Sequence, residues 1–118
     1  MKKALSIDDS ATVRNLVKMT LQGLGFEVDE ASNGKDALQK VKSNKYDVVL
    51  CDINMPVMNG LEFLREFKKL DKRTPVLMLT TETELNKKQE AKSLGATGWI
   101  VKPFNPNDLI KVIKRVVR

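Results

Sequence analysis

The stretch VVLCD at residues 48–52 decides the fold, because four apolar residues are followed directly by a carboxylate. A strand with one solvated face alternates apolar and polar residues, whereas an unbroken apolar run is typical of a strand buried on both faces. Strands of that kind occur in parallel sheets that helices cover on both sides. The stretch therefore predicts a buried strand with Asp52 at its carboxyl end.

Three further runs of this kind lie at residues 4–7, 76–79 and 99–101, and residues 27–31 form a weaker strand candidate. Between the runs, apolar residues recur at the spacing of an amphipathic helix, over residues 13–24, 35–42, 61–67 and 109–116. Turn residues separate these segments, and Pro106 suits a first helical turn. The predicted order is a strand followed by a helix, repeated five times.

This alternation predicts an α/β domain, a doubly wound parallel sheet with right-handed crossovers and helices on both faces. A chain of 118 residues with 42% apolar content can fill one hydrophobic core. We expect residues 1–118 to form a single domain that passes on any signal through a surface recognised by a separate partner.

The composition narrows the class of protein further. The net charge of +6 raises the possibility of a nucleic-acid partner, but aromatic residues make up only 5% and the cations are spread along the chain. The one cysteine, Cys51, lies inside an apolar run and is interpreted as a buried hydrophobe. No apolar stretch approaches the roughly 20 residues of a membrane span or forms a secretory signal. We expect a cytoplasmic protein that binds neither nucleic acid nor membrane.

Five polar residues directly follow predicted strands: Asp8, Asp9, Asp52, Thr80 and Lys102. Sites in parallel sheets form beyond the carboxyl ends of the strands, where the strand order reverses, so these side chains are expected at one edge. Each also has a simpler interpretation. The acids could cap the following helix, the threonine could end a strand, and the lysine could be solvated.

Three carboxylates at one strand edge are unfavourable unless a cation or a retained proton is present. Oxygen ligands without histidine favour a hard ion, and Mg²⁺ is the usual choice where phosphate is handled. A carboxylate such as Asp52 can also attack phosphorus and form an aspartyl phosphate. Thr80 and Lys102 would then supply a hydroxyl donor and a cation for the phosphoryl oxygens.

Four motifs together resemble the signature of response-regulator receiver domains, over essentially the whole chain: Asp8-Asp9-Ser10, then Asp52-Ile53-Asn54-Met55-Pro56 with Asn59-Gly60, then Leu79-Thr80, then Lys102-Pro103-Phe104. Among receivers the chain is most similar to the stand-alone chemotaxis regulators of the CheY type. The resemblance implies a (βα)5 fold with strand order 2-1-3-4-5.

The resemblance also implies a role for each residue of the site. Asp52 would accept a phosphoryl group from a histidine kinase of the CheA kind. Asp9 and Asp52 would ligate Mg²⁺ directly, Asp8 would hold metal-bound water, and Asn54 would offer its backbone carbonyl to the metal. A cis bond between Lys102 and Pro103 would aim the ammonium at the acceptor.

Two further pairs of residues follow from the resemblance. The side chains of Asn54 and Glu82 would tune self-dephosphorylation by shaping the access of water. Thr80 would move toward the phosphoryl group, and Trp99 would turn inward into the vacated space. Trp99 departs from the tyrosine or phenylalanine that is usual there. Indole is bulkier and its N–H needs a partner when buried, so this departure bears on how far the ring can turn inward.

The expected output face comprises the fourth helix, the last strand and the last helix, around Leu85, Lys88, Lys92, Trp99, Lys111 and Lys114. Its cationic character favours an acidic segment of a partner, and charge would raise the association rate more than the affinity. Expected partners are a flagellar switch protein or another protein effector, and in addition a phosphatase.

Two alternatives to a chemotaxis regulator stay open. One is a receiver with another output, such as a phosphorelay, sporulation control or regulated proteolysis. The other is a small aspartyl-phosphate phosphatase, which normally has a second acid two residues after its nucleophile. In this chain Asn54 lies two residues after Asp52, and Ser10 lies two residues after Asp8, so neither aspartate has the second acid. We therefore expect the chain to catalyse only its own phosphorylation and dephosphorylation, without turnover of a separate substrate.

Overall fold

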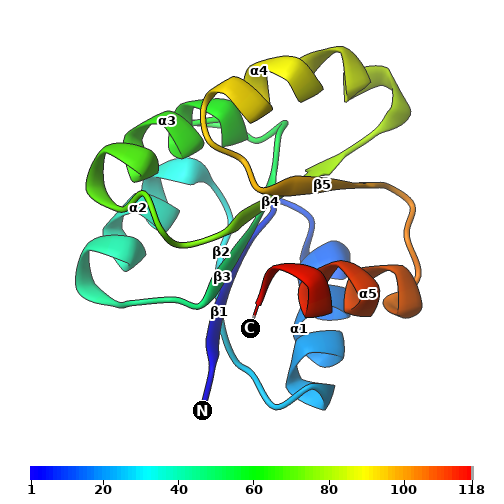
Figure 1. The fold of residues 1–118 in the computed structure, drawn as a ribbon. Coiled ribbons are helices and arrows are strands. Elements are labelled where there is room, and N and C mark those ends of the chain that lie inside the picture. The colour runs from blue at the N-terminus through cyan, green and yellow to red at the C-terminus, as the bar shows by residue number, and fades with distance from the viewer. Residues whose placement is uncertain (118) are drawn as a thin grey trace.

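The computed structural model describes residues 1–117, apart from the side chains of Glu82 and Leu85. Strands and helices alternate along the chain, as the sequence predicts (Figure 1). The strands are β1 (Lys3–Ile7), β2 (Glu27–Ala31), β3 (Val48–Asp52), β4 (Val76–Thr80) and β5 (Gly98–Val101). The helices are α1 (Ala11–Gly23), α2 (Gly34–Ser43), α3 (Gly60–Leu70), the 3₁₀ helix η1 (Glu82–Lys87), α4 (Lys88–Ser93) and α5 (Pro106–Val116). Within the described part of the chain, no helix is long and apolar enough to cross a membrane.

All strand pairs are parallel, and the strand order is β2-β1-β3-β4-β5. The predicted fold class and strand order are therefore confirmed. The order reverses between β1 and β3, which pair directly, with Ile7 opposite Cys51. The residues that follow β1 and the last residue of β3 therefore meet at the point where parallel α/β sheets form their binding sites.

The helices form one layer on each face of the sheet. Figure 1 shows α1 and α5 on one face and α2, α3 and α4 on the other. The two faces have separate apolar clusters, one around Leu50 and Leu109 beneath α1 and α5, the other around Val49 and Phe63 beneath α2 to α4. Every residue of β3 is buried, as expected for a strand that is covered on both faces.

Side-chain caps fix the helices that begin near the carboxyl ends of the strands. Ser10 Oγ accepts a hydrogen bond from the Val13 amide at the start of α1. Asn59 and Glu62 form a capping box at the start of α3. Such caps are worth about 1 kcal/mol each, and they also set the course of the loops that carry the polar residues of the site.

The fourth helical segment is the least regular of the five. It consists of η1 followed by α4, each six residues long. The Lys87 side chain makes no capping hydrogen bond at the start of α4, and Ala91 is the buried residue that anchors this helix. A small apolar anchor and a missing cap explain why the apolar spacing of the sequence identified no amphipathic stretch between β4 and β5.

Candidate functional site

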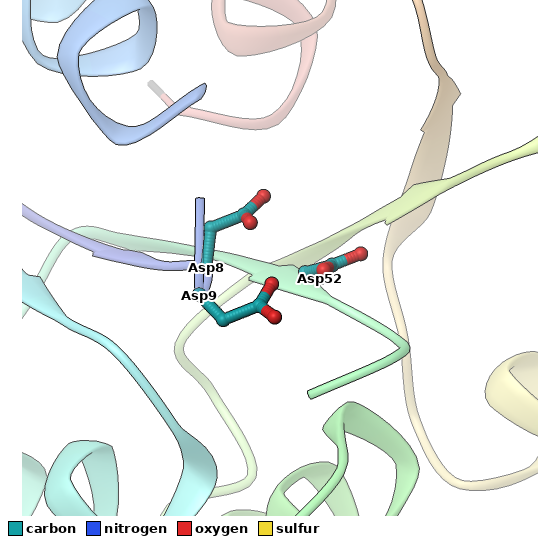
Figure 2. Close-up of side chains that lie close together, drawn as sticks. All are labelled: Asp8, Asp9 and Asp52. Carbon is teal, nitrogen blue, oxygen red and sulfur yellow. The ribbon is translucent and has the colours of Figure 1, made fainter. Parts of the chain in front are cut away.

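Three carboxylates meet at the reversal point of the sheet. One oxygen from each of Asp8, Asp9 and Asp52 lies within 4.8 Å of the others. Figure 2 shows the three side chains close together, two from the end of β1 and one from the end of β3. Asp8 is fully buried and Asp52 is 4% exposed, whereas Asp9 is exposed to solvent. The structure thus brings together the acids that the sequence placed after two neighbouring strands.

Local hydrogen bonds hold the first of these acids in place. Asp8 Oδ1 accepts a hydrogen bond of 2.9 Å from the Ser10 amide, which forms the turn into α1. The Arg14 guanidinium donates to the backbone carbonyl of Asp8, and its Nε lies 3.3 Å from Glu30 Oε1. Asp8 therefore both shapes the start of α1 and faces the site.

Close backbone packing holds Asp52. The Gly60 amide donates to the Ile53 carbonyl at 2.8 Å. A Cβ atom added at Gly60 would lie 2.1 Å from the carbonyl oxygen of Asp52, closer than any side chain permits. Glycine at the first position of α3 is thus required for the helix to approach the end of β3.

Lys102 reaches both buried acids from the end of β5. Its Nζ lies 3.0 Å from Asp52 Oδ1 and 3.3 Å from Asp8 Oδ2. Its amide donates to the Thr80 carbonyl at 2.6 Å, and the peptide bond to Pro103 is cis. The ammonium therefore lies at the centre of the site and is mostly buried, instead of extending into solvent.

The electrostatics of the site follow from burial and from the excess of acids. Burial and the neighbouring Asp8 raise the pKa of Asp52 to about 6, although Lys102 acts in the opposite direction. Burial disfavours the charge of Lys102, but its contacts with Asp52 and Asp8 outweigh burial and raise its pKa. One ammonium thus does not balance three carboxylates, and the cluster favours an additional cation.

Thr80 ends the neighbouring strand β4. Its side chain is 1% exposed, and its hydroxyl has no hydrogen-bond partner among the described residues. Asp52 pairs with Leu79 in the sheet, so Thr80 lies one residue beyond the partner of the acid. Buried hydroxyls are normally satisfied, and this one is free to donate to an oxygen that arrives at Asp52.

An open pocket of about 560 Å³ gives access to the acids. Asp9, Asp52, Asn54 and Lys102 line one side, and the exposed Asn54 is in reach of solvent. The segment after β4 lines the rest with Thr81, Thr83, Glu84, Asn86 and Lys87. The pocket leaves room for a group larger than a metal ion beside Asp52.

Sequence reasoning missed two charged residues at this site, Glu84 and Arg14. Glu84 accepts hydrogen bonds from the amide and hydroxyl of Thr81, at 2.9 and 3.1 Å, and its charge contributes to the raised pKa of Asp52. Its position after the strand that ends at Thr80 was the available signal. Arg14 lies one helical turn after Ser10, and nothing in the sequence pattern distinguished it from a solvated residue.

The predicted switch and partner residues lie around β5, which is one of the two edge strands of the sheet. Trp99 is half-buried, and the Lys88 ammonium lies 4.0 Å from the centre of its ring. Lys92 on α4 and Lys111 and Lys114 on α5 are exposed, on helices that cover opposite faces of the sheet. The side chains of Glu82 and Leu85 lie outside the described residues.

The fold and the site define a class of protein, a doubly wound α/β domain with an acidic, lysine-bridged site at its reversal point. The model of the response regulator receiver domain family matches residues 4–114. The chain therefore belongs to the response regulator receiver family, as its motifs predicted, and receiver domains of this family bind Mg²⁺ at such an acidic pocket.

Individual relatives agree with this assignment. The chemotaxis response regulator CheY4 of Vibrio cholerae is 50% identical with a TM-score of 0.93, and the match covers 99% of each chain. The transcriptional regulatory protein ResD of Bacillus subtilis is 35% identical over 98% of this chain and 48% of its own length. SrrA of Staphylococcus aureus, also a transcriptional regulatory protein, is 36% identical over 97% of this chain and 47% of its own. The chain thus spans about half the length of these two curated relatives.

Proposed function

We propose that the protein is a phosphorylation-controlled switch in which Asp52 accepts a phosphoryl group from a histidine kinase. The observation that carries the proposal is the contact of Lys102 with a buried Asp52 that also lies within the carboxylate cluster. An oxygen of Asp52 would form the bond to phosphorus while the bond between phosphorus and the kinase histidine breaks. Residues 1–118 would act as one receiver unit in the cytoplasm.

The residues present fit a magnesium ion, because three carboxylates exceed the charge of one ammonium and all are hard oxygen ligands. Asp9 and Asp52 would hold the ion directly, Asp8 through water, and Asn54 through its backbone carbonyl. A bound ion neutralises charge on the transferring phosphoryl oxygens. Lys102 would turn from the Asp52 carboxylate to a phosphoryl oxygen, and the free Thr80 hydroxyl would donate to another.

The signal would pass from Thr80 to Trp99 and out through the face that contains Lys88, Lys92, Lys111 and Lys114. Movement of the threonine toward the phosphoryl group would open space beneath β5, and the indole of Trp99, which is half-buried, would enter it. The site residues would act only on the chain's own phosphoryl group, with Asn54 and Glu82 tuning its hydrolysis. A phosphatase would be an additional partner.

For the output we favour chemotaxis through a flagellar switch protein. The support is the match to a chemotaxis regulator across 99% of both chains at 50% identity. A second candidate is control of transcription, since ResD and SrrA are transcriptional regulators that this chain matches over about half of their length. Retention of a flagellar switch protein on the phosphorylated form alone would support the first candidate. Its equal retention on both forms, or on neither, would count against it.

The acceptor role is tested by following the fluorescence of Trp99, the only tryptophan, while Mg²⁺ and then beryllofluoride are added. Beryllofluoride stands in for the phosphoryl group. We expect a response to the metal and a second response to beryllofluoride that disappears in Asp52→Asn. A second response that persists in Asp52→Asn would contradict the assignment of Asp52.

A further inference from the structure

A second pocket lies at the opposite end of the sheet from Asp52 and has a volume of about 520 Å³. The ends of α2 and α3 line it, together with the loops that lead into β3 and β4. We call it the basal pocket. Because β3 is five residues long, the basal pocket lies about 16 Å from the acceptor, too far for a bound group to touch both.

The floor of the basal pocket is apolar and held in place from behind. Phe67 stacks on Phe63 with ring centres 5.4 Å apart. The Tyr46 hydroxyl donates to Asp29 Oδ2 at 2.7 Å, which fixes the orientation of that ring. Leu70 is 57% exposed at the edge of the floor, although it is a large aliphatic residue. A preformed apolar floor binds a ligand with little loss of side-chain freedom.

The rim carries three cations, Lys45, Lys72 and Arg73, which are all exposed. Within the described part of the chain, none of their side chains makes a hydrogen bond or ion pair. The Asp71 carboxylate beside them already accepts hydrogen bonds from the amides of Arg73 and Thr74 and from the Thr74 hydroxyl. The positive charge of the rim is therefore available to a partner.

We propose that the basal pocket docks an acidic segment of a partner protein, with one bulky apolar side chain packed against Leu70 at the edge of the floor and aspartate or glutamate facing the three rim cations. The match of charge and the exposed Leu70 favour such a segment. Nucleic acid fits less well, because the apolar residue that this pocket exposes is the aliphatic Leu70, and the Tyr46 and Phe67 rings are too little exposed for bases to stack on them. Docking here goes beyond the phosphorylation switch and is independent of it.

The test uses three fluorescent peptides as probes: Asp-Glu-Phe-Asp-Glu, its amide counterpart Asn-Gln-Phe-Asn-Gln, and Asp-Glu-Ser-Asp-Glu. We expect the first to bind at least about tenfold more tightly than either of the others, since it alone combines charge with an apolar anchor. Amide chemical shifts recorded during the titration should change most around Leu70 and Thr74. Affinity should be the same with and without beryllofluoride.

Variants of the full chain locate the surface. The double variant Lys72→Glu/Arg73→Glu should weaken binding at least about tenfold, and Leu70→Ser, which keeps every charge, should weaken it as well. Lys35→Glu/Arg65→Glu makes the same change of net charge at exposed positions of α2 and α3 that do not line the basal pocket, and should leave the affinity within about twofold. Urea unfolding of each variant establishes that it folds.

Several outcomes would overturn the proposal. Equal binding of the acidic and amide peptides would remove the role of charge, and equal losses in the two double variants would indicate non-specific attraction. Chemical-shift changes centred on β5 would place binding on the output face. Displacement of the acidic peptide by a DNA duplex of equal total charge, at lower concentration than by unlabelled peptide, would assign the surface to nucleic acid.

Discussion

The Nζ atom of Lys102 lies 3.0 Å from Oδ1 of Asp52, across the end of β4 that separates their two strands. This contact places a cation on the proposed acceptor before any phosphoryl group arrives. It does not neutralise the negative charge of the site, because Asp8 and Asp9 remain beside Asp52 and the pKa of Asp52 stays raised to about 6. The metal-free protein therefore holds an acid in an environment that disfavours its charge.

The first prediction concerns the stability of Asp52→Asn without metal. The pKa of Asp52 is higher in the folded protein, about 6, than its ordinary 3.8, so the folded state binds this proton more tightly than the unfolded state. Ionisation therefore lowers the free energy of unfolding as pH rises from about 4 to about 6, by up to about 3 kcal/mol. Asp52→Asn avoids this loss.

Urea unfolding at pH 4 and pH 8 measures the effect. We expect Asp52→Asn to be more stable than the native protein at pH 8, and the difference to vanish at pH 4, which serves as the internal control. A less stable variant at pH 8 would show that the ion pair with Lys102 outweighs burial.

The second prediction is that Mg²⁺ raises the melting temperature and that Asp9→Asn abolishes most of this effect. A ligand at a hundred times its dissociation constant stabilises the folded state by about 2.7 kcal/mol. Asp9 is exposed, so its replacement removes a ligand without disturbing the core. Thermal unfolding in MgCl₂, against KCl of matched ionic strength, makes the comparison. Equal stabilisation of both proteins by Mg²⁺ would argue against Asp9 as a ligand.

The rule that polar residues after parallel strands converge was enough to predict the carboxylates and Lys102. It works because the hydrophobic pattern determines the strands and the sheet then aligns their carboxyl ends. The predicted strand ends were less accurate. Thr80 belongs to β4 and pairs with Val101 of β5, although the apolar run stops at Leu79, because backbone pairing continues past the last apolar residue.

Other features of the site depend on tertiary structure and could not be predicted. Glu84 joins the site because η1 folds back over the strand ends, and its sequence has no strong helical pattern. The need for glycine at position 60 follows from a contact with Asp52, eight residues earlier in the chain. A motif identifies such a glycine, but only the packing of α3 on β3 explains it.

The third prediction follows from that contact. Gly60→Ala would place a Cβ atom 2.1 Å from the Asp52 carbonyl oxygen, so α3 or the end of β3 must move. We expect a loss of about 1–3 kcal/mol in the free energy of unfolding and a weaker beryllofluoride response of Trp99. Gly23→Ala is the matched control, since a Cβ atom there meets nothing within 4 Å. Equal effects of the two substitutions would contradict the packing argument.

The fourth prediction concerns backbone strain beside the site. Val57 has φ 70°, a conformation that β-branched residues avoid, and its side chain is 76% exposed. Asparagine tolerates this conformation, so Val57→Asn should raise the free energy of unfolding by about 1 kcal/mol. Urea unfolding measures it, with Val57→Ala as the control that removes the branched side chain but still disfavours positive φ. A variant Val57→Asn that is no more stable than Val57→Ala would argue against strain.

The last prediction concerns the cation above the indole ring of Trp99. The Lys88 ammonium lies 4.0 Å from the ring centre and ties α4 to the edge strand, in a contact worth about 0.5–1 kcal/mol. If phosphorylation requires the indole to leave this position, Lys88→Met removes a contact that favours the inactive state. The beryllofluoride concentration at half response should then fall about two- to fivefold, as followed by Trp99 fluorescence. Lys92→Met, an exposed lysine on the same helix, should leave it unchanged. If both variants shift the response equally, the effect comes from net charge and the ring contact has no part in the switch.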